Sequence, residues 1–237
     1  MITATDLSKD YGKLKALDKV NLSFNKGACI AFIGPNGSGK TTLLKCILGM
    51  VVPSGGSISF NNVNITNAYL YRNQIGYMPQ IGNYPKNMSI GQVIGMMKDI
   101  REDISSELDE ELIEKFELTK ILEKRMGTLS GGTRQKVSAC LAFLFNAQVL
   151  ILDEPTAGLD PLSSELLKAK IIKEKLKGKL IIITSHVLSE LDDLITEVVY
   201  MQEGRIRFHI GIEALQSNTG EEKLTKAIAS IMLKNKL

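Results

Sequence analysis

The stretch Gly34-Pro35-Asn36-Gly37-Ser38-Gly39-Lys40-Thr41 is a glycine-rich loop that closes with a lysine and a threonine. A short apolar run, Cys29–Ile33, comes directly before it and predicts a buried parallel strand. Leucine and isoleucine follow at helical spacing, so the loop is expected to join a strand to a helix. That context predicts a phosphate-binding loop, because glycines let backbone N–H groups approach phosphate oxygens and the helix N-terminus adds partial positive charge.

The polar residues of this chain predict contacts with a nucleotide and a magnesium ion. Lys40 is expected to bridge the β- and γ-phosphates, and Thr41 to offer its hydroxyl to Mg²⁺. The apolar run 149–152 ends in Asp153, which would emerge at the sheet edge and hold Mg²⁺ through water. Glu154 is placed to polarise the attacking water or to accept its proton. These residues suffice for ATP hydrolysis, since phosphoryl transfer needs mainly positioning and charge neutralisation.

The order of strand and helix patterns predicts the fold class. Alternating polar and apolar residues predict antiparallel strands in three segments (residues 1–28, 57–60 and 74–77). Continuous apolar runs alternate with helical patterns, which favours a mostly parallel sheet covered on both faces (residues 29–33, 149–152 and 180–184). The expected fold is α/β: a phosphate-loop NTPase core with a mostly parallel sheet, an antiparallel β subdomain and a helical insertion.

Capping residues predict where several helices begin. Ser89 is expected to cap one helix, and another is expected to begin near Gly131. Asp160-Pro161 predicts a further helix, with Asp as its cap and Pro at its first position, and Gly178 ends it. The lysine-rich run 168–179 lies in that helix and is interpreted as its solvated face.

Composition and charge exclude several classes of partner. The net charge of +3 is too small to argue for nucleic acid. No stretch approaches the roughly 20 apolar residues that span a bilayer, so a transport role would need a pore on another chain. The three cysteines stand singly in apolar stretches and are predicted to be buried, and the lack of a secretory signal suits a reducing cytoplasm.

The motif Leu129-Ser130-Gly131-Gly132-Thr133 lies between the phosphate loop and Asp153-Glu154. With this combination the chain resembles the nucleotide-binding subunit of the ATP-binding cassette (ABC) family, from about Tyr11 to about Gly204. The resemblance implies an ATPase that uses ATP and Mg²⁺, powers an integral membrane permease on a separate chain, and is peripheral on the cytoplasmic face of the inner membrane. It implies one ABC ATPase domain in three parts: a catalytic core with the β subdomain, a helical subdomain and a short C-terminal tail (residues 1–81 with 147–210, 82–146 and 211–237).

The resemblance also assigns roles to single residues. Gln80 matches the glutamine that senses Mg²⁺ and the γ-phosphate and links to the helical region. His186 matches the switch histidine that contacts the γ-phosphate, and Asp160 matches the loop that communicates across a dimer. Tyr11 matches the aromatic residue that stacks on adenine. The remaining nucleotide contacts are assigned to the phosphate loop (Gly34, Pro35, Asn36, Gly37, Ser38, Gly39, Lys40, Thr41 and Thr42).

The Ser-Gly-Gly motif predicts a second site for an anion. Ser130, Gly131 and Gly132 are expected to open a helix whose N–H groups, with the serine hydroxyl, face a phosphate. In the family this site closes on ATP held by the other subunit, so the resemblance implies a head-to-tail homodimer with two ATP molecules. The motif ends in Thr133 where glutamine is commoner, which puts the contacts beyond the γ-phosphate in question.

Two longer stretches narrow the resemblance to one group within the family. Residues 76–93 and 128–137 are similar to the NosF family, the copper-processing ABC ATPases of nitrous-oxide reductase maturation. This similarity implies a periplasmic copper-processing partner besides the permease. The alternative is the ATPase of a bacterial exporter for a lipid, peptide or drug. A soluble nucleic-acid-associated ABC ATPase is less favoured, because it would require a basic groove.

Overall fold

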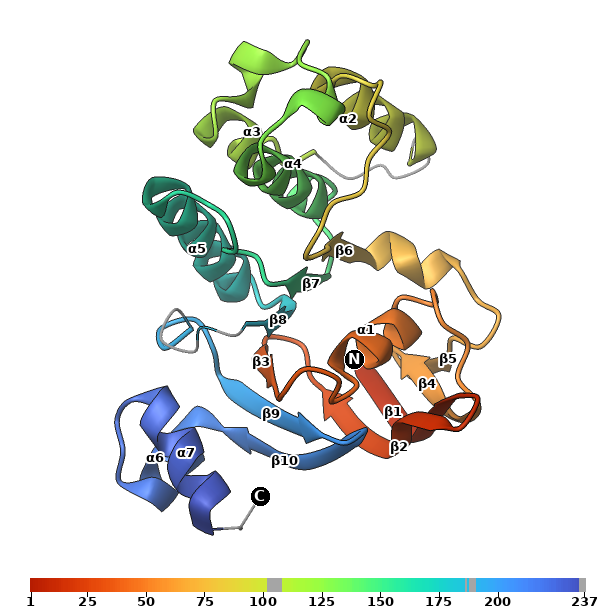
Figure 1. The fold of residues 1–237 in the computed structure, drawn as a ribbon, viewed down its shortest axis with the longest axis vertical. Helices are drawn as coiled ribbons and strands as arrows, with labels where there is room; N and C mark the ends of the chain where they lie inside the picture. Colours follow the sequence, from red (N-terminus) through yellow and green to blue (C-terminus); the bar gives the residue numbers. More distant parts are fainter. Residues whose placement is uncertain (102–107, 186, 188–190, 235–237) are drawn as a thin grey trace. The chain divides into compact units, whose positions relative to one another are not determined.

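The computed structural model describes residues 1–101, 108–185, 187 and 191–234. Backbone contacts divide the chain into two compact units. The helices and strands of both units are labelled in Figure 1. The first unit consists of Met1–Tyr71 and Leu180–Leu237, and the second consists of Arg72–Lys179.

An antiparallel sheet forms the N-terminal part of the first unit. Its strand order is β2-β1-β4-β5, with β1 at Ile2–Tyr11, β2 at Leu14–Phe24, β4 at Gly55–Phe60 and β5 at Val63–Asn64. Ile2 pairs with Phe24 on one side and with Phe60 on the other, and all three side chains are buried. The antiparallel strands predicted in residues 1–28 and 57–60 are therefore confirmed.

A second sheet of the first unit contains the strand that leads into the phosphate loop. Its order in this unit is β10-β9-β3-β8, where β3 (Cys29–Ile33) is parallel to β8 (Leu180–Thr184) and to β9 (Glu197–Gln202). β10 (Arg205–Gly211) is antiparallel to β9. All residues of β3 and β8 are buried, as expected for parallel strands covered on both faces. Phe32 pairs with Thr184, so β3 and β8 end at the same edge.

Among the described residues, three helices complete the first unit. α1 (Lys40–Ile47) follows the phosphate loop and buries Leu43, Leu44 and Ile47. Gly49 comes soon after α1 with a φ angle of 67°, which a glycine adopts without strain. α6 (Ile212–Thr219) and α7 (Leu224–Lys234) follow β10 and contact each other. Four apolar side chains of these two helices are buried (Leu215, Leu224, Ala227 and Ile228).

Two parallel strands lie in the second unit, β6 (Ile75–Met78) and β7 (Val149–Asp153). The prediction of an antiparallel strand at residues 74–77 is therefore wrong. The chain between β6 and β7 folds into helices and returns in the same direction, as parallel pairing requires. The helix α4 (Gly131–Phe143) packs directly against β6 at Gly76. The approach is so close that a Cβ atom at Gly76 would lie 2.0 Å from the carbonyl oxygen of Ala142.

The predicted helix starts in the second unit are confirmed. Ser89 caps α2 (Ile90–Ile100) in a capping box: its Oγ accepts from the Gln92 N–H, and Gln92 Oε1 accepts from the Ser89 N–H. Ser130 caps α4, and Asp160 caps α5 (Pro161–Leu176). The short elements of this region are α3, η1, η2 and η3 (Glu111–Lys115, Leu70–Gln74, Leu118–Ile121 and Met126–Thr128), of which η1 runs across the boundary between the units.

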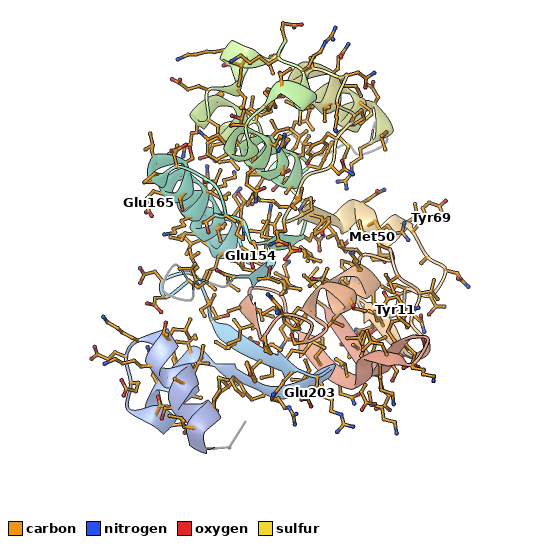
Figure 2. All side chains as sticks on the ribbon, in the orientation of Figure 1. Tyr11, Met50, Tyr69, Glu154, Glu165 and Glu203 are labelled. Atoms are coloured by element: carbon orange, nitrogen blue, oxygen red, sulfur yellow. The ribbon has the colours of Figure 1, made fainter. Side chains whose placement is uncertain are left out.

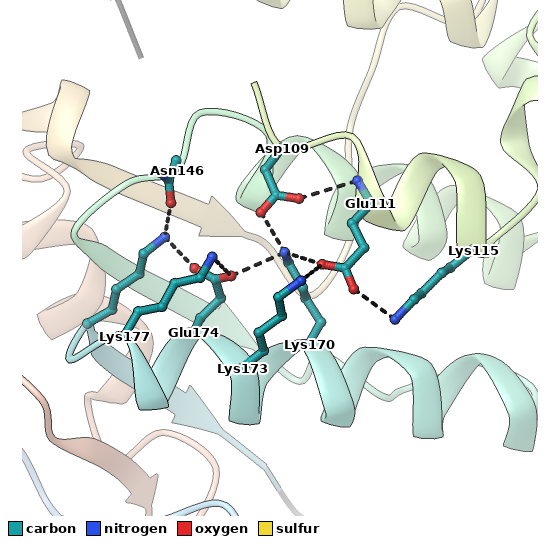
Figure 3. Close-up of polar contacts among 9 residues, drawn as sticks. Asp109, Glu111, Lys115, Asn146, Lys170, Lys173, Glu174 and Lys177 are labelled. Carbon is teal, nitrogen blue, oxygen red and sulfur yellow. Dashed lines mark hydrogen bonds and ion pairs between the residues drawn. The ribbon is translucent and has the colours of Figure 1, made fainter. Parts of the chain in front are cut away.

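The lysine-rich run of α5 differs from its predicted role as a solvated face. Lys170 has a fully buried side chain, and its Nζ forms ion pairs with Asp109 (2.5 Å), Glu111 (2.8 Å) and Glu174 (3.1 Å) (Figure 3). Glu174 is also fully buried. Helical periodicity turns residues 170 and 174 toward α3, where the carboxylates compensate the charge of the lysine. Asp109 and Glu111 lie some sixty positions earlier in the chain, so no local pattern in the run itself predicts these two partners.

The predicted α/β fold class is confirmed: parallel strands, an antiparallel sheet and a helical insertion are all present. All three cysteines are buried, also as predicted. The division of the chain at residues 82, 146 and 210 stays a prediction. Within the described residues, no helix has both the length and the apolar character that crossing a membrane requires.

Candidate active site

The phosphate loop joins β3 to α1 in the first unit. Gly34, Gly37 and Gly39 have φ angles of 150°, 78° and 104°, which residues with a Cβ atom rarely adopt. A Cβ atom at Gly34 would lie 2.0 Å from the carbonyl oxygen of Met201, and one at Gly39 would lie 2.5 Å from that of Ala16. A Cβ atom at Gly37 would meet nothing within 4 Å. The loop is therefore held closely by neighbouring backbone at its two ends and is open around Gly37.

Lys40 is the first residue of α1, and its ammonium group lies back over the loop. Nζ donates hydrogen bonds to the carbonyl oxygens of Gly34 (2.7 Å) and Pro35 (3.1 Å) and to Ser38 Oγ (3.4 Å). Ser38 is buried, and its carbonyl oxygen accepts from the Gly204 N–H, which ties the loop to the turn after β9. A cation over a glycine-rich loop at a helix N-terminus is a donor set that fits the phosphates of a nucleotide.

Tyr11 lies at the end of β1 with 48% of its surface exposed (Figure 2). The ammonium group of Lys9 lies 5.1 Å from the ring centroid. An exposed ring of this kind offers an apolar face to a planar base. His186, the predicted switch histidine, lies outside the described residues.

Asp153 and Gln80 lie at the same end of the strand pair in the second unit. Met78 pairs with Leu152, so Gln80 follows β6 at the edge where β7 ends in Asp153. Asp153 is only 8% exposed, whereas Gln80 is exposed. Burial, and then the negative charge of Asp153, raise the pKa of the Tyr77 phenol. A carboxylate and an amide oxygen at one edge are ligands of the kind that Mg²⁺ takes.

Glu154 follows β7 and has an unusual backbone conformation. Its φ angle is 54°, in the left-handed region that residues other than glycine seldom occupy. Its carbonyl oxygen accepts a hydrogen bond from the Ala157 N–H (3.1 Å) and another from Nε2 of Gln135 on α4 (3.2 Å). Left-handed residues persist where the surroundings over-determine them, and they cluster at functional sites.

The Ser-Gly-Gly motif forms the N-terminus of α4, as predicted. Ser130 Oγ accepts a hydrogen bond from the Thr133 N–H (3.2 Å) and lies 2.9 Å from Thr133 Oγ1. Ser130 and Gly131 are exposed, and Leu129 is buried beneath them. A Cβ atom at Gly132 would lie 2.6 Å from the Gly158 carbonyl oxygen, so only glycine fits there. The exposed helix N-terminus, with a serine hydroxyl beside it, is a donor set that suits an anion.

Asp160 caps α5 and also pairs with the helix of the Ser-Gly-Gly motif. Its carboxylate accepts from the Ser163 N–H (2.9 Å) and hydroxyl (2.7 Å), and Lys136 Nζ on α4 lies 2.8 Å away. The hydrogen bond from Lys136, followed by those from Ser163, lowers the pKa of Asp160 well below its usual range. Asp160 therefore stays ionised and joins the start of α5 to α4.

A profile of the family described as "ABC transporter" matches residues 17–157, which is more than half of the chain. The chain belongs to the ABC transporter family. It is an ATP-binding subunit of that family, and the prediction that it is an ATPase is confirmed.

Known relatives of this ABC ATPase are similar over most of its length. The uncharacterized ABC transporter ATP-binding protein YhaQ of Bacillus subtilis (strain 168) is 31% identical, over 95% of this chain and 76% of the relative. The lipopolysaccharide export system ATP-binding protein LptB of Haemophilus influenzae is 30% identical, over 87% of this chain and 88% of the relative. A solved structure of the ATP-binding subunit of an ABC transporter superposes with a TM-score of 0.87 at 26% identity, covering 98% of this chain and 99% of the other.

Two residues of this ABC ATPase were not among the predicted site residues but contact them. Gln135 bonds the backbone of Glu154, and Lys136 pairs with Asp160. Both follow the Ser-Gly-Gly motif within two helical turns, but residue type and spacing alone do not indicate their partners. In the structure Gln135 lies on the buried side of α4, where a polar side chain generally has a hydrogen-bond partner.

Proposed function

We propose that two copies of this chain bind ATP head to tail and power a membrane permease carried on a separate chain. The observation that carries this proposal is the presence of two anion-type sites, the phosphate loop around Lys40 and the exposed N-terminus of α4 at Ser130. The first suits the phosphates of a bound nucleotide. The second is open to a phosphate brought by another copy, as in the head-to-tail dimers of the family.

Each copy contributes a distinct set of residues to ATP binding. Lys40 and the loop backbone hold the β- and γ-phosphates, and the exposed ring of Tyr11 stacks on adenine. The Mg²⁺ ion neutralises phosphate charge when bound, and the residues that would hold it are Thr41, Gln80 and Asp153. The buried carboxylate of Asp153 at the end of β7 and the hydroxyl of Thr41 suit this hard cation.

Hydrolysis is assigned to Glu154 with the help of His186 and Gln80. Glu154 orients the attacking water or accepts its proton, and His186 contacts the γ-phosphate. Ser130, Gly131 and Gly132 of the other copy complete the site. The Thr133 hydroxyl lies within hydrogen-bonding distance of Ser130 Oγ, so Thr133 supports Ser130.

Transmission of the dimer closure to the permease is assigned to Gln80 and the helical subdomain, residues 82–146. ATP binding closes the two copies, the closure moves the helical subdomain, and hydrolysis reopens the dimer. The chain then lies on the cytoplasmic face of the membrane, attached through the permease. Communication between the copies is assigned to Asp160 because its loop resembles the family's dimer-communication loop, and within its own copy its carboxylate pairs with Lys136.

For the cargo we propose copper and sulfur processing in nitrous-oxide reductase maturation, with a periplasmic partner beyond the permease. The support is the similarity of residues 76–93 and 128–137 to the NosF family. The second candidate is the ATPase of a bacterial exporter for a lipid, peptide or drug, and the name of the LptB relative, a lipopolysaccharide export protein, favours a lipid. Both candidates use the same ATPase mechanism and differ in the cargo, the permease and the periplasmic partner.

The Glu154→Gln variant tests the ATPase mechanism. It is expected to hydrolyse ATP at least a hundredfold more slowly and to form a dimer in size-exclusion chromatography with ATP but not with ADP. Adding Lys40→Ala to it should abolish the dimer, because the nucleotide no longer binds. The matched control is Glu165→Gln, the same change at an exposed carboxylate on α5 (Figure 2), which should keep wild-type turnover. Wild-type turnover of Glu154→Gln would contradict the assignment.

The cargo is tested by affinity purification of the chain from solubilised native membranes, followed by mass spectrometry. A permease recovered with nitrous-oxide reductase maturation proteins supports copper processing. A permease recovered with a lipid-export apparatus replaces that assignment with the export candidate. Recovery with ribosomes or DNA alone would overturn the transport role.

A further inference from the structure

The backbone of Glu154 is held in place by a side chain of the helix that carries the Ser-Gly-Gly motif. Gln135 is 5% exposed, and its Nε2 donates to the Glu154 carbonyl oxygen at 3.2 Å. The φ angle of Glu154 is 54°, a conformation that persists only where neighbouring contacts impose it. The direction of the Glu154 side chain depends on this conformation, because the backbone angles set where the Cβ atom points.

The contact belongs to a set of three between α4 and the segment that follows β7. Gly132 packs against the carbonyl oxygen of Gly158, Gln135 bonds Glu154, and Lys136 pairs with Asp160. All three α4 residues lie within the first two turns of the helix, which begins at Gly131 and is capped by Ser130. Because a helix is rigid over two turns, a displacement of Ser130 carries these contacts with it.

We propose that Gln135 is a positioning residue that couples the Ser-Gly-Gly motif to the orientation of Glu154 in the same copy. This inference rests on the proposed function, in which Ser130 meets the ATP of the other copy while Glu154 acts on the ATP of its own copy. Gln135 therefore links the two ATP sites of the dimer. When α4 closes on the partner's ATP, the hydrogen bond from Gln135 sets the Glu154 carboxylate for hydrolysis at its own site.

The test is the Gln135→Met variant, which keeps the length of the side chain and removes the donor. The Glu154 carbonyl oxygen keeps its bond from the Ala157 N–H, so no buried acceptor is orphaned. We expect kcat to fall at least tenfold, the KM for ATP to stay within twofold, and the Hill coefficient for ATP to fall toward 1. A residue that only supported folding would not produce this split between kcat and KM.

The matched control is Ser138→Ala, on the same helix. Ser138 is fully buried and hydrogen-bonds Tyr84 at 2.9 Å, so its loss removes a buried polar contact that does not reach Glu154. This control should lower the melting temperature without changing kcat or the Hill coefficient. Gln135→Asn, which keeps the donor but shortens its reach, should give a kcat between those of Gln135→Met and the wild type, and it provides a second folded variant.

A companion measurement separates failure of this inference from failure of the proposed function. Glu154→Gln alone must form an ATP-dependent dimer, and if it does not, the head-to-tail mechanism itself fails. Glu154→Gln with Gln135→Met should form the dimer as well, because Gln135 acts after closure. If the dimer forms and folded Gln135→Met or Gln135→Asn retains wild-type kcat and cooperativity, Gln135 has no positioning role.

Discussion

The buried ion cluster around Lys170 leads to a quantitative prediction for the Lys170→Met variant. Lys170 has no exposed side-chain surface and pairs with Asp109, Glu111 and Glu174 (Figure 3). Methionine matches the length of the lysine stem but cannot neutralise these carboxylates. The variant therefore leaves acidic groups in a buried place without their central cation, which is the costly way to break an ion cluster.

The expected loss follows from which partners the carboxylates keep. Removing one member of a buried ion pair costs about 3–5 kcal/mol of unfolding free energy. Glu174 keeps Lys177 at 2.7 Å and Lys179 at 2.5 Å, and Glu111 keeps two lysines of its own (Lys115 and Lys173). We therefore expect the low end of the range, about 3 kcal/mol.

Urea unfolding followed by far-ultraviolet circular dichroism measures this loss as a lower midpoint at an unchanged slope. Because the chain has two compact units, hydrogen exchange of the amides in Arg72–Lys179 should report the same loss locally. The control is Lys120→Met, the same substitution in an exposed pair with Glu117, which should change stability by less than about 1 kcal/mol.

Two results would refute the reasoning about the Lys170 cluster. One is a loss in Lys170→Met no larger than that of Lys120→Met, which would make the cluster equivalent to a surface pair. The other concerns the double variant Lys170→Met with Glu174→Leu, which removes the buried acid as well. It should recover part of the loss, since replacing both charges by apolar groups leaves less charge unpaired. A strictly additive further loss would contradict this account.

Three further predictions concern pH, capping and the phosphate loop. Burial opposes ionisation of Glu174, but hydrogen bonds from Lys177 and Lys179 outweigh burial and lower its pKa from 4.5 to about 2. The stabilisation by ionised Glu174 is therefore complete above pH 4.5 and is lost as the pH falls toward 2. Acid titration of Glu174→Gln should show a shallower fall in stability than the wild type, and parallel curves would contradict the prediction. Ser89→Ala should lower the unfolding free energy by about 1 kcal/mol in urea titration, because it removes the capping box of α2, whereas no loss would mean that the cap is replaced by water. Gly34→Ala should weaken ATP binding at least tenfold in a fluorescent-nucleotide titration, since its Cβ atom would overlap the Met201 carbonyl oxygen, and wild-type affinity would show that the loop adapts.

Local rules predicted much of the fold because short-range physics decides it. The apolar run before the phosphate loop is the buried parallel strand β3, and Ser89, Ser130 and Asp160 cap the helices predicted after them. Each of these features depends on residues within about four positions, through strand burial or a side chain that reaches the first helical turn. The family was also recognisable from the spacing of the phosphate loop, the Ser-Gly-Gly motif and the acidic strand end.

The direction of β6 and the burial of Lys170 were mispredicted for the same reason. Whether residues 74–77 pair in parallel depends on where the chain returns, some seventy residues later, at β7. A lysine in a charged helical run appears solvated unless the carboxylates of a distant segment meet it, as Asp109 and Glu111 do. Helix and strand propensity and hydrophobic periodicity depend on nearby residues, so they do not predict partners that are distant in the chain.

The sequence by itself determined the α/β class, the family and the chemical identity of the candidate site, because glycine, lysine and carboxylate at these positions permit few other functions. Only the tertiary structure showed that Gln135 donates a hydrogen bond to the backbone of Glu154 and that Lys136 forms an ion pair with Asp160. Both contacts join α4 to the segment after β7. The physical reason is that hydrogen bonds between separate elements depend on how the elements pack, and packing is set by the whole core at once.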